Sequence, residues 1–290
     1  GGKDEAARGL IQGITLAGVL FDEVALMPES FVNQATARCS VEGAKWWFNC
    51  NPEGPFHWFK QNWIDRAGER RLLYVHFLMT DNKTLSKRTL ERYANLYTGV
   101  FARRFIQGEW SVADGVIYSM FDGKENVGAD IGFTPEREFI AVDYGTFNPC
   151  VFLHFYAAGR GDDIRHYVDR EYYHDGRAAA NGASAQKDDG EYSDDMLDFC
   201  GGRRDIPIII DPSASSFITR LRHDGFTNVL PAKNAVAKGL SAVSSEFARR
   251  ALVLSPDCLH TLGEIPSYVW DAKHAALCGE DRPLKENDHC

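Results

Sequence analysis

The chain has 290 residues, of which 44% are hydrophobic and 25% are charged, and this supplies enough apolar material for the cores of one large or two ordinary domains. No apolar run reaches the roughly 18 residues that span a bilayer, and the N-terminus lacks the basic-then-apolar order of a signal peptide, so we expect an untargeted, cytoplasmic protein. The net charge of −9 excludes a uniformly basic coat for nucleic acid but not local basic patches, and the seven scattered cysteines form no C-x-x-C pair and indicate neither a zinc ribbon nor a disulfide framework.

The first part of the chain alternates apolar runs with polar loops. Residues 10–22 predict a strand that ends in an acidic pair, and residues 44–49 predict a second strand that ends in the turn-rich sequence CNPEGP. A third strand is predicted over residues 72–79, followed by a turn and by helical stretches from Ser86, which can cap the first helix, to residue 110.

Basic and aromatic side chains in this half could bind nucleic acid. Six basic residues could contact phosphate, although such residues are more often solvated at the surface. They are Arg66, Arg70, Arg71, Arg103, Arg104 and, in the second half, Lys233. Four tryptophans could stack on bases, but their positions in strand and helix patterns favour packing in the core: Trp46, Trp47, Trp58 and Trp110.

A Gly-rich segment with weak periodicity, residues 114–136, is the candidate linker between two domains. Beyond it the pattern predicts three antiparallel strands, a polar tract over 175–191 that is either disordered or a loop over the site, and then alternating strands and helices. The final helix is expected over 256–272. This order indicates an α/β domain with a mixed sheet.

Two strands of this domain each end in a carboxylate. Asp143 ends the strand FIAVD, and Asp211 ends IPIIID. Carboxylates at the ends of neighbouring strands can converge on a divalent metal ion, which prefers hard anionic oxygen ligands, whereas the alternative is that each aspartate caps a turn. Three antiparallel strands with an acid on the first, an acid closing the fourth and an acidic cluster near the C-terminus form the layout of the ribonuclease H-like fold. Asp288 and His289 supply that last cluster.

The order and spacing of several segments resemble the large terminase subunit of tailed bacteriophages, of the prophage type, over nearly the whole chain. These segments are GVLFDEVALMPESFVNQATARCS, FNCNPEGPFHWFK, FARRFIQGEW, GVIYSMFD, FIAVDYGTFNPC, IIIDPSASSF, SYVWD and KENDHC. The resemblance implies part of a P-loop ATPase-type motor domain over residues 1–113, the linker over 114–136, and a ribonuclease H-like nuclease domain over 137–290. In this family the motor pumps DNA into the capsid and the nuclease cuts the concatemer.

The resemblance also implies roles for individual residues of the motor. VLFDE is similar to a Walker B strand, in which Asp22 would hold the Mg²⁺ of ATP and Glu23 would orient or activate the hydrolytic water. Asn49 and Asn51 resemble the coupling motif of the motor, where asparagine could sense the γ-phosphate or could equally cap a turn. The phosphate-cradling motif G-x-x-x-x-G-K-[ST] is not in the sequence, so we expect a fragment that hydrolyses ATP poorly by itself.

For the nuclease, the resemblance implies two Mg²⁺ or Mn²⁺ ions held by Asp143, Asp211, Asp288 and His289, with a further family aspartate expected just beyond Cys290. Two ions would clamp the attacking and leaving oxygens of a phosphodiester in double-stranded DNA. The implied partners are DNA, the small terminase subunit and the portal protein. Two alternatives stay open, another ribonuclease H-like recombination nuclease and a non-catalytic prophage remnant that binds portal or DNA.

Overall fold

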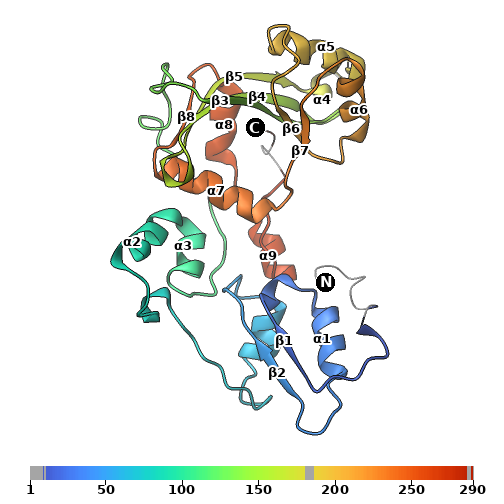
Figure 1. Cartoon of the computed structure of the whole chain (residues 1–290), viewed down its shortest axis with the longest axis vertical. Coiled ribbons are helices and arrows are strands. Elements are labelled where there is room, and N and C mark those ends of the chain that lie inside the picture. Colours follow the sequence, from blue (N-terminus) through green and yellow to red (C-terminus); the bar gives the residue numbers. More distant parts are fainter. Residues whose placement is uncertain (1–8, 10, 180–185, 286–288, 290) are drawn as a thin grey trace. The chain divides into compact units, whose positions relative to one another are not determined.

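The computed structural model describes residue 9 and residues 11–179, 186–285 and 289. The chain forms two compact units (Figure 1). The first contains the residues up to Asp114 together with Trp270–Arg282, and the second contains Gly115–Val269 together with the residues from Pro283 onward. In the described part of the chain, no helix has both the length and the apolar composition needed to cross a membrane.

The first unit contains a parallel pair of strands, β1 (Gly18–Phe21) and β2 (Lys45–Phe48). Helix α1 (Glu29–Ala37) lies between them in the chain, as a parallel pair requires. The rings of Phe21 and Phe48 stack at 5.1 Å, and the two strands, α1 and the π-helical turn η3 (Lys60–Ile64) share one core. The buried residues of that core are Phe21, Val24, Val32, Ala35, Phe59 and Trp63.

Shorter elements complete the first unit. They are the 3₁₀ turns η2 (Val24–Leu26) and η4 (Met79–Asp81) and the helices α2 (Lys87–Leu96), α3 (Gly99–Phe105) and α9 (Ala272–Cys278). The predicted cap of α2 is confirmed, because the Ser86 hydroxyl accepts a hydrogen bond from the Thr89 amide at 3.1 Å. Trp270, just before α9, packs edge-on against Phe101 of α3 at 6.2 Å.

Two predictions for this unit are wrong. Residues 72–78 form no strand, and Leu73 and Phe77 are 90% and 76% exposed. A strand needs a hydrogen-bonded neighbour, and in the described residues of this unit the sheet consists of β1 and β2 alone. Trp46 and Trp47 are 40% and 54% exposed instead of core residues, while Trp58 and Trp110 do pack against the core as expected.

The second unit is built on one mixed sheet whose spatial order is β7-β6-β3-β4-β5-β8. Its strands are β3 (Arg137–Asp143), β4 (Cys150–Ala158), β5 (Arg165–His174), β6 (Ile208–Ile210), β7 (Val229–Pro231) and β8 (Leu252–Leu254). The first three are antiparallel neighbours, β6 lies parallel to β3, β7 parallel to β6, and β8 parallel to β5. This topology confirms the predicted mixed sheet of the ribonuclease H-like fold.

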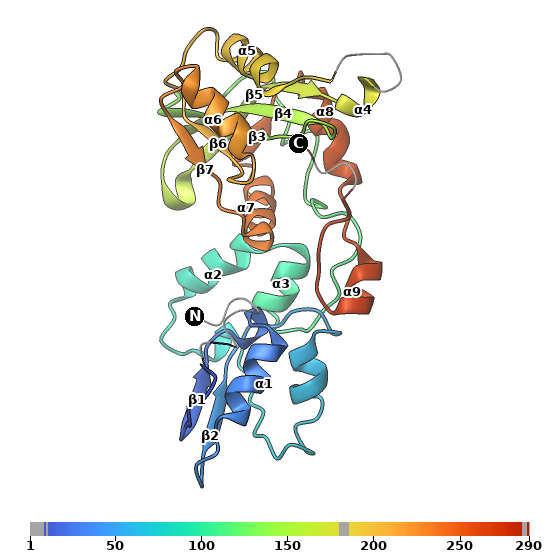
Figure 2. The same ribbon diagram turned by 90° about the vertical axis from the view of Figure 1, so that its right-hand side faces the viewer.

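Helices cover both faces of this sheet (Figure 2). Alternation along β4 sends Phe152 to one core and Leu153 to the other. The Phe152 side is covered by α5 (Asp189–Phe199) and α6 (Ser215–His223), and the Leu153 side by α7 (Val236–Ala248) and α8 (Leu259–Glu264). Short turns occupy the connections: η5 (Gly161–Asp163), α4 (Gly176–Ala179) and η6 (Ile265–Ser267).

Two connecting segments differ in detail from the sequence pattern. The predicted helix over 256–272 ends at Glu264, because Pro266 lacks the amide that an α-helix needs and the chain continues as the turn η6. In the Gly-rich segment that follows Asp114, Asn126 is 1% exposed and donates hydrogen bonds to the carbonyls of Phe247 and Leu252. That segment therefore packs on the second unit.

Candidate functional site

Asp143 and Asp211 lie at the same edge of the sheet in the second unit. Strands β3 and β6 run parallel, and the last pair in their register is Val142 with Ile210, so the two aspartates occupy the next position on adjacent strands. Adjacent strands lie about 4.8 Å apart. The Asp143 side chain is 52% exposed and Asp211 is partly exposed. The two residues are neighbours on adjacent strands, and neither side chain is buried in the core.

Asp211 is stabilised as an anion. Its Oδ1 accepts a hydrogen bond from the Ser213 amide at 2.7 Å. The pKa of Asp211 is lowered from its usual value by the Ser213 hydroxyl, then by the Ser213 amide, with a smaller contribution from the Asn234 side chain. The ionised form that a cation would need is therefore present at neutral pH.

His289 joins this edge from the end of the chain. Its Nδ1 lies 3.3 Å from Oδ2 of Asp143, and its amide donates a hydrogen bond to Oε2 of Glu264 at 2.9 Å. The imidazole is 15% exposed. The structure thus places His289 against Asp143, with Asp211 on the adjacent strand, whereas Asp288 lies outside the described residues.

The chemistry of these donors fits a divalent cation. Asp143 and Asp211 offer anionic oxygens from rigid strands, which is the ligand type that Mg²⁺ and Mn²⁺ prefer. Among the residues that the structure describes, no group of three or more His, Cys, Asp or Glu side chains is arranged to hold a metal ion. The described site therefore supplies a carboxylate pair, and any ion bound there needs further ligands.

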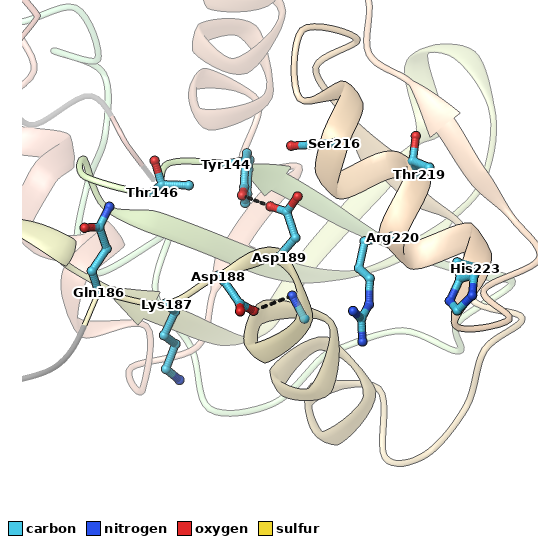
Figure 3. A pocket seen from close by; sticks show the side chains of 11 residues that line it. Tyr144, Thr146, Gln186, Lys187, Asp188, Asp189, Ser216, Thr219, Arg220 and His223 are labelled. Atoms are coloured by element: carbon cyan, nitrogen blue, oxygen red, sulfur yellow. Dashed lines mark hydrogen bonds between the residues drawn. The ribbon is translucent and has the colours of Figure 1, made fainter.

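An open polar groove of about 1100 Å³ lies between α5 and α6, and Tyr144, the residue after Asp143, forms part of its wall (Figure 3). Its lining residues are Tyr144, Thr146, Gln186, Lys187, Asp188, Asp189, Gly190, Ser216, Thr219, Arg220 and His223. Tyr144 donates its hydroxyl hydrogen to Asp189, and one face of α6 presents Thr219 and Arg220 to the groove (Figure 3). The Arg220 guanidinium pairs with Asp224 at 2.6 Å, so opposite charges are balanced along this wall.

A second predicted site lies at the edge of the strand pair in the first unit. Asp22 and Asn49 follow the last register pair of the parallel strands β1 and β2. Asn49 holds the turn between them: its amide donates to the Phe21 carbonyl, its carbonyl accepts from the Val24 amide at 2.9 Å, and its side-chain Oδ1 accepts from the Glu23 amide at 2.8 Å.

These contacts leave the acidic side chains of the turn at the surface. Asp22 and Glu23 are both exposed, and Glu23 has a left-handed backbone with φ of 57°. Such a conformation is uncommon for a residue with a side chain and marks a turn that its surroundings hold in place. Asn49 thus caps the turn, which is one of the two roles that the sequence allowed for it. Asn51, two residues later, is exposed.

A buried ion cluster in the first unit was missed by the sequence reasoning. Arg104 is 3% exposed, pairs with Glu53 at 3.1 Å and with Asp281, and donates to the carbonyl of Ser111. Burial raises the pKa of Glu53, and Arg104 opposes that rise. The surface role expected for Arg104 is wrong, because its partners lie far along the chain in positions that no local pattern connects.

Comparisons with known proteins show the family of this chain. The family described as "Terminase large subunit, T4likevirus-type, N-terminal" matches residues 1–124. The solved large terminase of a thermophilic bacteriophage is 48% identical, with a TM-score of 0.90, over 100% of this chain and 70% of that one. The chain belongs to the phage large terminase family. No curated protein sequence matched.

Structures of the same thermophilic phage terminase with nucleotides also match. Its ADP complex aligns with a TM-score of 0.90 at 48% identity over 99% of this chain and 69% of that one. Its ATP-γ-S complex aligns with a TM-score of 0.88 at 48% identity over 96% and 68%. Membership of the large terminase family sets aside the alternative of a recombination nuclease.

Proposed function

We propose that the second unit of this large terminase is a metal-dependent endonuclease that cuts concatemeric double-stranded DNA. The observation that carries the proposal is the position of Asp143 and Asp211 at the next register position of the adjacent parallel strands β3 and β6. Membership of the terminase family supports it.

In this proposal Asp143 and Asp211 hold Mg²⁺ or Mn²⁺, with Asp288 and His289 as further members of the site. The bound ions would neutralise the charge that develops on the phosphodiester during hydrolysis. The protein's own contribution is to fix the carboxylates on rigid strands and to keep Asp211 ionised. Ser213 does this for Asp211, and His289 contacts Asp143.

We also propose that the first unit forms part of a DNA-packaging ATPase. Asp22 would hold the Mg²⁺ of ATP and Glu23 would act on the hydrolytic water, while Asn49 and Asn51 lie in the loop that follows β2. The ADP and ATP-γ-S complexes of the thermophilic phage relative support a nucleotide site in this unit. The small terminase subunit, the portal protein and DNA would be the partners, in the cytoplasm of the host.

A plasmid-nicking assay with Mn²⁺ tests the nuclease. We expect Asp143→Asn and Asp211→Asn each to lower the nicking rate at least about 100-fold, since even the loss of an outer-sphere partner of a metal commonly costs 10–100-fold. Asp205→Asn is the matched control, because this aspartate of the same unit is 72% exposed and pairs with Arg203 on the surface. Wild-type protein that does not nick would support the non-catalytic remnant, whereas nicking that survives both substitutions would show that Asp143 and Asp211 do not form the cutting site.

A further inference from the structure

The carboxylate of Glu264 lies at the C-terminal end of helix α8 and holds the end of the chain. Its Oε2 accepts the hydrogen bond from the His289 amide at 2.9 Å, across 25 positions of sequence. The helix that carries it is anchored, because the next residue, Ile265, is 6% exposed and belongs to the core with Val168 and Leu254. Glu264 therefore offers a fixed acceptor to a segment that approaches from elsewhere in the chain.

His289 connects this acceptor to the proposed nuclease site. Its backbone is bound to Glu264, while its imidazole Nδ1 lies 3.3 Å from Oδ2 of Asp143. A few residues earlier, the Leu284 amide donates to the Val269 carbonyl at 2.9 Å. The segment is thus fixed at Leu284 and again at His289, and the second attachment sets where the imidazole lies relative to Asp143.

We propose that Glu264 is a positioning residue of the nuclease, which holds the His289 backbone so that the imidazole rests on Asp143. The inference depends on the nuclease function proposed above. The role requires an oxygen acceptor at this position and does not require a negative charge, because the group that Glu264 binds is a backbone amide. A direct metal ligand would differ, since replacing a carboxylate by an amide would remove its anionic oxygen.

The substitutions Glu264→Gln and Glu264→Ala separate these roles in the whole chain. Gln keeps an oxygen acceptor and Ala removes it. The matched control is Glu136→Ala in the same unit, whose side chain is 58% exposed and pairs with Arg137 at 3.9 Å. Glu264→Ala and Glu136→Ala remove the same side-chain atoms, and Glu264→Gln removes none of the carbon chain. Thermal melts of all three variants would show whether any of them has lost its fold.

The first measurement needs no metal. Selective ¹⁵N-histidine labelling gives one amide signal for each of the nine histidines, and hydrogen exchange of the His289 signal reports its hydrogen bond directly. We expect exchange about 10-fold faster or more in Glu264→Ala, because a hydrogen bond to a charged group is lost, and exchange near the wild-type rate in Glu264→Gln and in the control. Unchanged exchange in Glu264→Ala would overturn the positioning role.

The second measurement is plasmid nicking across a Mn²⁺ titration. We expect Glu264→Ala to nick about 10-fold more slowly at limiting Mn²⁺ and Glu264→Gln to be close to wild type, in line with the effect of groups that orient metal ligands. A Gln variant as slow as the Ala variant would overturn positioning in favour of a charge requirement. Failure of the nuclease itself shows separately, as Asp143→Asn nicking at the wild-type rate, and leaves the exchange result to be read without it.

Discussion

At the scale of single residues, His57 of the first unit shows how burial sets the charge of a side chain. It is 5% exposed, and its Nδ1 accepts a hydrogen bond from the Phe59 amide at 3.2 Å. Burial lowers the pKa of its imidazole to about 4, a backbone hydrogen bond with Ala25 opposes this, and the nearby Arg104 adds to the lowering. His57 is therefore neutral at physiological pH.

We expect His57→Gln to flatten the pH dependence of stability in the first unit. The folded pKa is below the unfolded value of 6.5, so the unfolded chain binds the proton first as pH falls. The stabilisation is fully present above pH 6.5 and is lost as pH falls from there toward about 4, with a slope of about 1.4 kcal/mol per pH unit.

Tryptophan fluorescence isolates the unit in which this change occurs. All six tryptophans of the chain belong to the first unit: Trp46, Trp47, Trp58, Trp63, Trp110 and Trp270. Urea unfolding followed by fluorescence at several pH values between 7 and 4 would measure the slope, with the exposed His223 changed to Gln as the control. Parallel pH profiles for the wild type and His57→Gln would contradict the prediction.

Residue positions could be predicted from sequence where local pattern determines them. Asp143 and Asp211 each end an apolar run, and parallel strands bring such carboxyl ends to one edge of a sheet, as the register of β3 and β6 shows. Glu53, Arg104 and Asp281 could not be found in this way. Their cluster depends on tertiary packing between segments 51 residues apart and more, and a single sequence carries no local signal for such pairs.

At the scale of elements, the N-terminus of helix α8 is capped by a side chain from strand β5. Glu171 of β5 accepts hydrogen bonds from the amides of His260 and Thr261, at 2.6 and 2.9 Å, and from the Thr261 hydroxyl at 2.8 Å. The residue before the helix, Cys258, provides no side-chain cap. A carboxylate placed there satisfies free amides and interacts well with the positive end of the helix dipole.

We expect Glu171→Ala to destabilise the second unit by about 1–2 kcal/mol, the usual cost of losing a helix cap. Glu171→Gln keeps one acceptor oxygen and should be intermediate. Urea unfolding followed by far-UV circular dichroism would show the loss, while the tryptophan transition of the first unit should not move. A Glu171→Ala transition that coincides with that of Glu136→Ala would show that Glu171 does not cap the helix.

Element types were easier to predict than element ends. The three antiparallel strands of the second unit follow from their apolar runs and turns, because those signals are local. The helix expected through Pro266 stops before it. Part of the polar tract is helical, since Asp188 accepts from the Glu191 amide and Glu191 from the Asp188 amide in a capping box that composition alone does not reveal.

At the scale of the whole molecule, the chain passes from one unit to the other three times. It leaves the first unit after Asp114, returns with Trp270–Arg282, and enters the second unit again at Pro283. Asp281 in the returning segment is paired with the buried Arg104. The domains predicted from the sequence are continuous stretches of the chain. The first compact unit is not continuous, because it includes Trp270–Arg282, and only the packing of this segment reveals that.

We expect Asp281→Ala to destabilise the first unit by about 3 kcal/mol, because it leaves the buried guanidinium of Arg104 with one carboxylate partner fewer. Arg104→Met combined with Asp281→Ala should lose less than the two single changes added together. Urea unfolding followed by tryptophan fluorescence measures this, with the exposed neighbour changed in Glu280→Ala as the control. Strict additivity in the double variant would mean that the two side chains do not stabilise each other.

The three crossings also bear on how such a gene can be recombined. A single exchange between related phage genomes at the codon after Asp114 would replace everything downstream, including Trp270–Arg282. The hybrid would then set a foreign residue 281 against the resident Glu53 and Arg104. The buried Arg104 of such a hybrid keeps both of its carboxylate partners only when the incoming DNA encodes an acid at position 281.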